Sequence, residues 1–133
     1  MYTEFYLKNY LKEAIQDVIN KPSWNCCFED IKNIFLLYKE DNSKIYDWNN
    51  FLKACEKFFL NEYHISIGYS SANQTNFHYT IYVTRPCKAY KYRLDELAPF
   101  SKEEFKIEFD VKFAALKQII RLVEEKNLKP FKL

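Results

Sequence analysis

Glycine is almost missing from this chain of 133 residues, and its single copy is Gly68. A Walker A loop, a G-x-G-x-x-G turn and a G-x-S-x-G elbow each require several residues that lack a Cβ atom. The sequence therefore excludes the nucleotide-binding and hydrolase classes that are built on those loops.

Metal-binding patterns are also missing. The only histidines, His64 and His78, are 14 residues apart, and no H-E-x-x-H or EF-hand pattern occurs. The four cysteines form no C-x-x-C pair and no short Cys/His spacing: Cys26, Cys27, Cys55 and Cys87. We therefore predict no cofactor and no metal site.

Long apolar runs are lacking too. An export signal needs an apolar core near the start of the chain, but the first residues, MYTEFYLKNYLKEA, carry the charged residues Glu4 and Lys8 at that place. This pattern argues against export. Residues 63–84 carry no formal charge, but SSANQTN would put polar groups at the centre of a bilayer. We predict a cytoplasmic protein with reduced thiols and no membrane partner.

Apolar and aromatic residues are abundant. Hydrophobic residues make up 48% of the chain and aromatic residues 19%, which is too much apolar surface for a disordered protein. A chain of this length can bury one substantial core. We therefore predict a single domain over residues 1–133.

Three segments before residue 63 have helical periodicity. Residues 3–20 carry one apolar stripe that Thr3 can cap, and the segment stops before Pro22, because the residue preceding proline avoids helical angles. A second stripe covers residues 24–38. The third follows Asp47 as N-cap and is the most regular: Trp48, Phe51, Leu52, Cys55, Phe58 and Phe59.

A period of two replaces the helical pattern in residues 63–84. It predicts a β-hairpin whose loop is centred on Asn73 and whose buried face carries six residues: Tyr63, Ile65, Ile67, Phe77, Tyr79 and Ile81. Residues 89–94 alternate as a third strand, and residues 105–109 as a short fourth strand.

A final helix is predicted over residues 110–126, with Asp110 as its cap. Its apolar positions cover more than one stripe, so we expect the helix to be covered on two sides. The predicted fold class is α+β, with three N-terminal helices, an antiparallel meander of three to four strands and a C-terminal helix packed on the sheet.

Charge is distributed unevenly although the formal net charge is only +2. Residues 63–94 contain no acidic residue and four basic residues. If the third strand keeps its apolar residues on the core side, the outer face of the sheet collects a cationic set: His64, His78, Tyr82, Lys91 and Arg93. Gly68 would leave room on that face for a flat ligand.

This outer face has three interpretations. The simplest is a solvated polar face of an antiparallel sheet. The second is a nucleotide- or RNA-binding module, in which Lys91 and Arg93 pair with phosphate and Tyr82 stacks on a base. The third is a metal-independent ribonuclease that uses His64 and His78 as acid and base.

The C-terminal region predicts a partner interface, because its apolar residues exceed the needs of one small core. The candidate interface residues are Ile119, Leu122, Leu128 and Phe131. We therefore predict a small accessory or inhibitor-like protein that binds a protein partner or self-associates, and we favour binding over an enzymatic activity.

Overall fold

The computed structural model describes residues 4–22, 25–37, 48–72, 76–87, 91–98 and 104–130. Its elements follow the order α1 (Glu4–Asn20), α2 (Phe28–Leu37), α3 (Trp48–Tyr63), β1 (Ile65–Ala72), β2 (Asn76–Cys87), β3 (Lys91–Ala98) and α4 (Glu108–Glu125). The α+β class is confirmed, with helices at the start, an antiparallel sheet and a closing helix. The capping candidates Thr3 and Asp47 lie outside the described residues.

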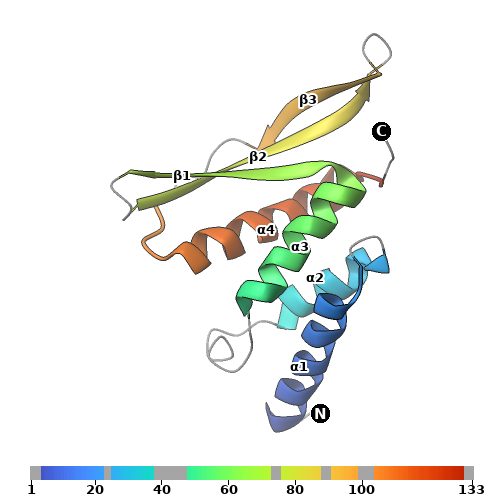
Figure 1. The fold of residues 1–133 in the computed structure, drawn as a ribbon, viewed down its shortest axis with the longest axis vertical. Coiled ribbons are helices and arrows are strands. Elements are labelled where there is room, and N and C mark those ends of the chain that lie inside the picture. The colour runs from blue at the N-terminus through green and yellow to red at the C-terminus, as the bar shows by residue number, and fades with distance from the viewer. Residues whose placement is uncertain are drawn as a thin grey trace.

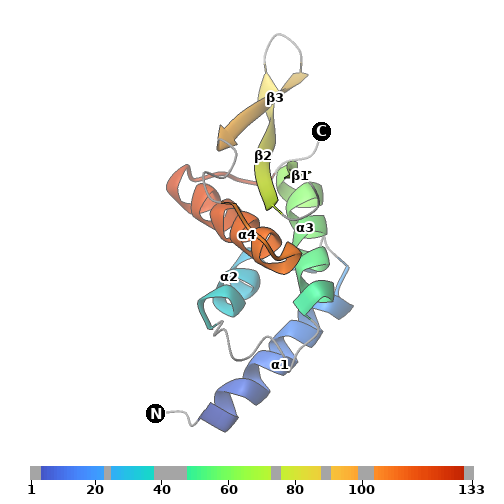
Figure 2. The same ribbon diagram turned by 90° about the vertical axis from the view of Figure 1, so that its left-hand side faces the viewer.

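The elements are stacked in layers (Figure 1). The sheet lies above α3 and α4, and α2 and α1 lie below those two helices. Packing follows the same order, since α3 contacts β1, α4 contacts β2 and α1 contacts α2 and α3. The hairpin of β2 and β3 extends past the helices, as Figure 2 also shows.

Helix α3 is the centre of the core. All six residues of its predicted stripe are buried: Trp48, Phe51, Leu52, Cys55, Phe58 and Phe59. The spacing of three and four residues places these side chains on one face, which packs against β1, α1 and α4. Helix α2 is shorter than predicted and begins at Phe28, because Cys27 contributes the carbonyl that accepts the first helical hydrogen bonds, from Asp30 and Ile31.

Four of the six residues predicted for the buried face of the hairpin lie there. Tyr63 is buried but is the last residue of α3, and Phe77 is only half-buried. Ile65 and Ile81 are buried, and Ile67 and Tyr79 pack against the core. Its register differs from the prediction, since Gly68 pairs with Thr80 rather than with His78. The ladder is centred on residue 74, one position later than expected, because a polar loop gives no sharp signal for its own centre.

Strand β3 completes the sheet order β1-β2-β3. It pairs with the distal part of β2, and the register shifts between Ile81 and Val83.

The predicted fourth strand over residues 105–109 is wrong beyond its first residue. Phe105 forms an isolated bridge to Phe77, and the chain then enters α4 at Glu108, so Ile107 is the N-cap and Asp110 lies in the first turn.

Helix α4 is covered on two sides, as predicted, by β2 and α3. Of the predicted interface residues, Ile119 is 0% exposed and Leu122 is 5% exposed within the chain itself, so both side chains belong to its core. Leu128 is half-buried against the core and donates its amide to the Val123 carbonyl at 3.0 Å, while Asn127 takes the left-handed conformation of a Schellman turn. Phe131 lies outside the described residues.

Candidate functional site

The structure does not bring the two histidines together. His78 pairs with Ser70, and His64 lies six residues before Ser70, which corresponds to roughly 20 Å along a strand. An acid and base pair requires both groups to reach one substrate bond, and the strand register does not place the two histidines that close together. His64 has a φ of 55° and makes the turn from α3 into β1.

The space above Gly68 is not open to a flat ligand. A Cβ atom added to Gly68 would lie 3.2 Å from Cε2 of Tyr82. The Tyr82 ring thus covers the glycine from the neighbouring strand, a cross-strand packing that stabilises glycine in sheets. Tyr82 therefore acts as a structural side chain at this position.

Lys91 and Arg93 belong to another part of the sheet. Arg93 pairs with Arg85 and Lys91 pairs with Cys87, so both lie in register with odd-numbered residues of β2. His78 and Tyr82 are even-numbered residues of the same strand, and residue 85 is roughly 23 Å along the strand from His78. The predicted five-residue site is therefore divided along the length of the sheet.

His78 has an acidic neighbour instead of a cationic one. Its Nε2 lies 3.9 Å from Oε1 of Glu104, and its buried Nδ1 has no hydrogen-bond partner among the described residues. The predicted absence of carboxylates from this face holds for the hairpin sequence but not for the folded chain. An anion would meet the Glu104 charge here.

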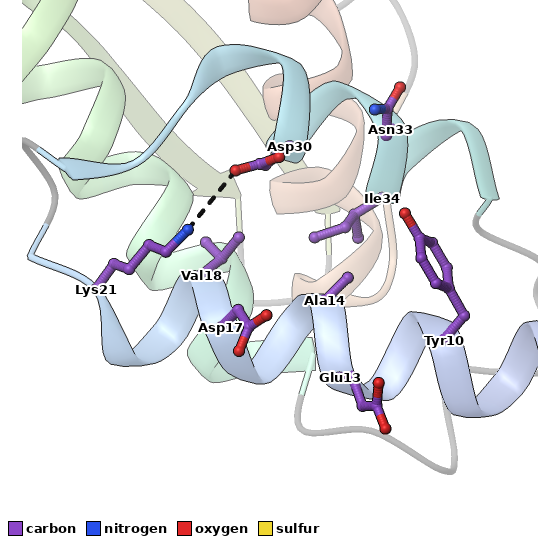
Figure 3. A pocket seen from close by; sticks show the side chains of 9 residues that line it. All are labelled: Tyr10, Glu13, Ala14, Asp17, Val18, Lys21, Asp30, Asn33 and Ile34. Carbon is purple, nitrogen blue, oxygen red and sulfur yellow. Dashed lines mark ion pairs between the residues drawn. The ribbon is translucent and has the colours of Figure 1, made fainter.

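A groove with polar groups on its walls lies between α1 and α2. Figure 3 shows its nine lining residues, which enclose about 220 Å³: Tyr10, Glu13, Ala14, Asp17, Val18, Lys21, Asp30, Asn33 and Ile34. Five of them belong to α1 and recur at intervals of three and four, so they form one stripe along the helix, and Lys21 follows directly after its last residue. Those of α2 form the facing wall.

The groove has an apolar floor and a mainly acidic wall. Ala14, Val18 and Ile34 supply the apolar contacts. Three of the lining residues are acidic, Glu13, Asp17 and Asp30, and one is basic, Lys21, which gives a formal charge of −2. A local excess of negative charge favours cations.

Both ends of the groove are closed by side chains (Figure 3). At one end Nζ of Lys21 lies 3.9 Å from Oδ2 of Asp30, and both side chains are about half exposed. At the other end Tyr10 extends from α1 towards Asn33 and Ile34 on α2. Tyr10 is 56% exposed, so its ring is accessible at this end.

The cysteine nearest the groove is an unreactive thiol. Sγ of Cys26 lies 3.8 Å from the carbonyl oxygen of Val18, and burial raises the pKa of Cys26 above its ordinary value. Burial raises the pKa of Cys55 still further. A thiol with a raised pKa carries little thiolate, so neither cysteine has the properties of a nucleophile.

Metal binding and membrane insertion receive no structural support in the described ranges. No group of three or more His, Cys, Asp and Glu side chains in these residues is arranged to hold a metal ion. None of the described helices is long and apolar enough to cross a membrane. The groove carboxylates are thus spread along a wall and do not converge on one point.

Sequence reasoning missed this groove. Glu13 and Asp17 have the pattern of the solvated face of an amphipathic helix, and only the position of α2 turns them into one wall of a cavity. The available signal was weak: Glu13 follows Tyr10 by three residues and Asp17 follows Glu13 by four, so these polar residues lie on one side of α1 next to its apolar stripe. No protein-family model, curated protein or solved structure matches this chain.

Proposed function

We propose that this chain is a small intracellular binding protein whose groove takes a cationic side chain from a protein partner. The observation that carries the proposal is the acidic groove between α1 and α2, with its apolar floor and formal charge of −2. The proposal includes no catalytic step.

The size of the groove supports a side chain as its occupant. Sites for drug-sized molecules and cofactors usually enclose about 300–1,000 Å³. The groove encloses about 220 Å³, which is below that range. One long side chain, presented by a partner, fits such a volume better than a free cofactor.

The chemistry of the walls supports arginine or lysine. The methylene stem of either side chain can pack on Ala14, Val18 and Ile34, while its charged end remains near the carboxylates. Asp17 and Glu13 on α1 attract the positive charge. The exposed ring of Tyr10 offers a cation–π contact at the end of the groove opposite the Lys21–Asp30 pair.

The test is binding of a labelled peptide of alternating arginine and alanine, measured by fluorescence anisotropy, with a glutamate and alanine peptide as the reference. We expect the basic peptide to bind and the acidic peptide not to bind. Asp17→Asn should weaken binding about fivefold, near the upper end for one exposed ion pair.

The matched control is Gln16→Lys on the same helix. Gln16 is exposed and does not line the groove, and its replacement changes the net charge by the same amount as Asp17→Asn. The control should retain the affinity of the unmodified chain. Equal binding of the two peptides, or equal weakening by both substitutions, would contradict the proposal.

A second candidate function is binding of a nucleotide or RNA on the ribbon of β2 and β3. The observation that favours it is the register of β3 on β2, which places the basic positions Arg93 and Arg85 opposite each other in the ladder. Lys91 adds a further positive charge at the distal end of the ribbon.

The double substitution Lys91→Glu and Arg93→Glu tests this candidate. We expect RNA and nucleotide binding to be lost in a gel-shift assay while circular dichroism remains unchanged, because the field of the ribbon changes sign. Undiminished binding by a folded double variant would reject the ribbon as an anion site. Binding of the arginine peptide to the groove should be unaffected.

A further inference from the structure

The outer edge of β1 has no strand beside it in the described part of the chain. The sheet order is β1-β2-β3, so β2 lies inside the sheet. The far edge of β2 is occupied by β3 and by Phe105, whose amide donates to the Phe77 carbonyl at 3.0 Å. Figure 2 shows β1 at the outside of the sheet, above α3.

A free edge exposes main-chain groups. Alternate residues of an edge strand direct their N–H and C=O groups away from the sheet, so the eight residues of β1 present about four such positions. Within the described ranges, β2 is the only segment that forms main-chain hydrogen bonds with residues 65–72. Ser70 and Ser71 are exposed, so this part of the strand is accessible.

The two edges of the sheet differ in protection. Natural edge strands are blunted by charged residues, proline, bulges or short length. Strand β3 contains Lys91, Arg93, Asp95 and Glu96, and its pairing is interrupted by a register shift. Strand β1 contains neither charge nor proline, and its eight register positions pair without interruption.

Apolar surface accompanies the free edge. A cavity of about 150 Å³ lies against β1 and is lined by residues that include Leu60, Ser66 and Ile67. Leu60 is 50% exposed. Tyr69 is held over α3 by the hydrogen bond that its hydroxyl donates to the Glu56 carboxylate. A strand added at this edge would cover these groups.

We propose that β1 pairs with β1 of a second copy of this chain. Antiparallel pairing around a two-fold axis would make one continuous sheet of six strands in the order β3-β2-β1-β1-β2-β3, because each copy contributes three. A second copy fits this edge because a strand without charge meets its own copy without repulsion. The pairing satisfies the outward main-chain groups of both copies, and it is independent of the groove.

The test is sedimentation velocity on the full chain over a concentration series, together with hydrogen exchange of the β1 amides. We expect a dimer, and amide protection in β1 that increases with protein concentration. The substitutions Ser70→Lys and Ser71→Lys place two charges on the edge, so dimerisation should weaken at least tenfold. Gln16→Lys with Asn49→Lys is the control, since both residues are exposed on helices, and it should remain dimeric.

Four outcomes would overturn the proposal: a monomer at every concentration, species larger than a dimer, equal dimerisation of both double variants, or a dimer whose β1 amides exchange independently of concentration. If the edge variant does not fold by circular dichroism, hydrogen exchange on the unmodified chain decides alone.

Discussion

The groove between α1 and α2 and the free edge of β1 lie at separate ends of the helical core and have opposite chemistry (Figure 1). The groove is lined by side chains with three acidic groups and one basic group. The edge offers main-chain groups on a strand without any charge. The comparison teaches that the two proposed binding surfaces should respond differently to a change of conditions, since charge would control the first and strand geometry the second.

The largest effect concerns the core that both surfaces share. Phe59 is fully buried on α3, and its ring centroid lies 6.2 Å from that of Phe28 on α2 and 5.9 Å from that of Tyr63. We expect Phe59→Ala to lower the free energy of unfolding by about 3–5 kcal/mol, because it leaves a cavity at the junction of helices and sheet.

Urea unfolding followed by tryptophan fluorescence and by circular dichroism checks this prediction. The neighbour Leu60 is half exposed, so Leu60→Ala is the control and should cost less than about 1 kcal/mol. Both probes should report one transition for both variants. Separate transitions for the helices and the sheet would show that the two surfaces do not share a cooperative core.

The next effect separates the two surfaces. The double substitution Glu13→Gln and Asp17→Asn leaves Asp30 as the only acidic residue of the groove, opposite Lys21. We expect the affinity for the arginine peptide to fall about tenfold, or about 1.4 kcal/mol. The dissociation constant of the dimer, measured by sedimentation equilibrium, should change less than twofold. A parallel change in both dissociation constants would contradict the independence of the groove and the β1 edge.

The fold shows where sequence patterns suffice and where they fail. Helix α3 and the inner face of the hairpin were predictable, because Phe51, Phe59, Ile65 and Ile81 follow strict helical or strand periods. The pairing of β3 with β2 was not predictable from the sequence. It includes a register shift between Ile81 and Val83, which depends on both strands together and leaves no pattern in either one alone.

The candidate site was less predictable than the fold. The groove arises from the packing of α2 on α1, so Asp30 and Asp17 line one cavity although 13 residues separate them in the sequence. The free edge of β1 required the strand order. Conversely, the lack of charge in residues 63–84 was visible in the sequence, and its relation to a free edge appears only in the folded sheet.

A smaller effect tests the contact between the edge and α3. Burial, followed by the hydrogen bond to Glu56, raises the pKa of Tyr69. Tyr69→Phe should cost about 0.5–1.5 kcal/mol at neutral pH, the net value of one hydrogen bond. Above about pH 10 the unfolded chain releases the Tyr69 proton while the folded chain retains it, so the stability of the unmodified chain decreases there.

The difference between Tyr69→Phe and the unmodified chain should therefore decrease as the pH rises above about 10. Urea unfolding at neutral and alkaline pH measures it. Tyr63, Cys26 and Cys55 also have raised pKa values, but they are present in both proteins and cancel in the comparison. A difference that is constant or increases with pH would contradict a retained proton on Tyr69.

The smallest effect concerns the outer face of the hairpin. Because Tyr82 covers Gly68, a double-mutant cycle with Gly68→Ala and Tyr82→Ala should give a coupling energy of about 0.5–1 kcal/mol. Thermal unfolding of the four proteins provides the values. A coupling near zero would mean that the ring does not cover the glycine and that this face is open.

The most direct test of two chemically distinct surfaces is one salt series on the unmodified chain. The affinity for the arginine peptide and the dissociation constant of the dimer are measured together at about 0.05 M and about 0.5 M sodium chloride, over which screening of exposed charges increases strongly. We predict that peptide binding weakens at least tenfold while dimerisation changes less than about threefold. Peptide binding that is insensitive to salt, or dimerisation that weakens in parallel with it, would contradict the account.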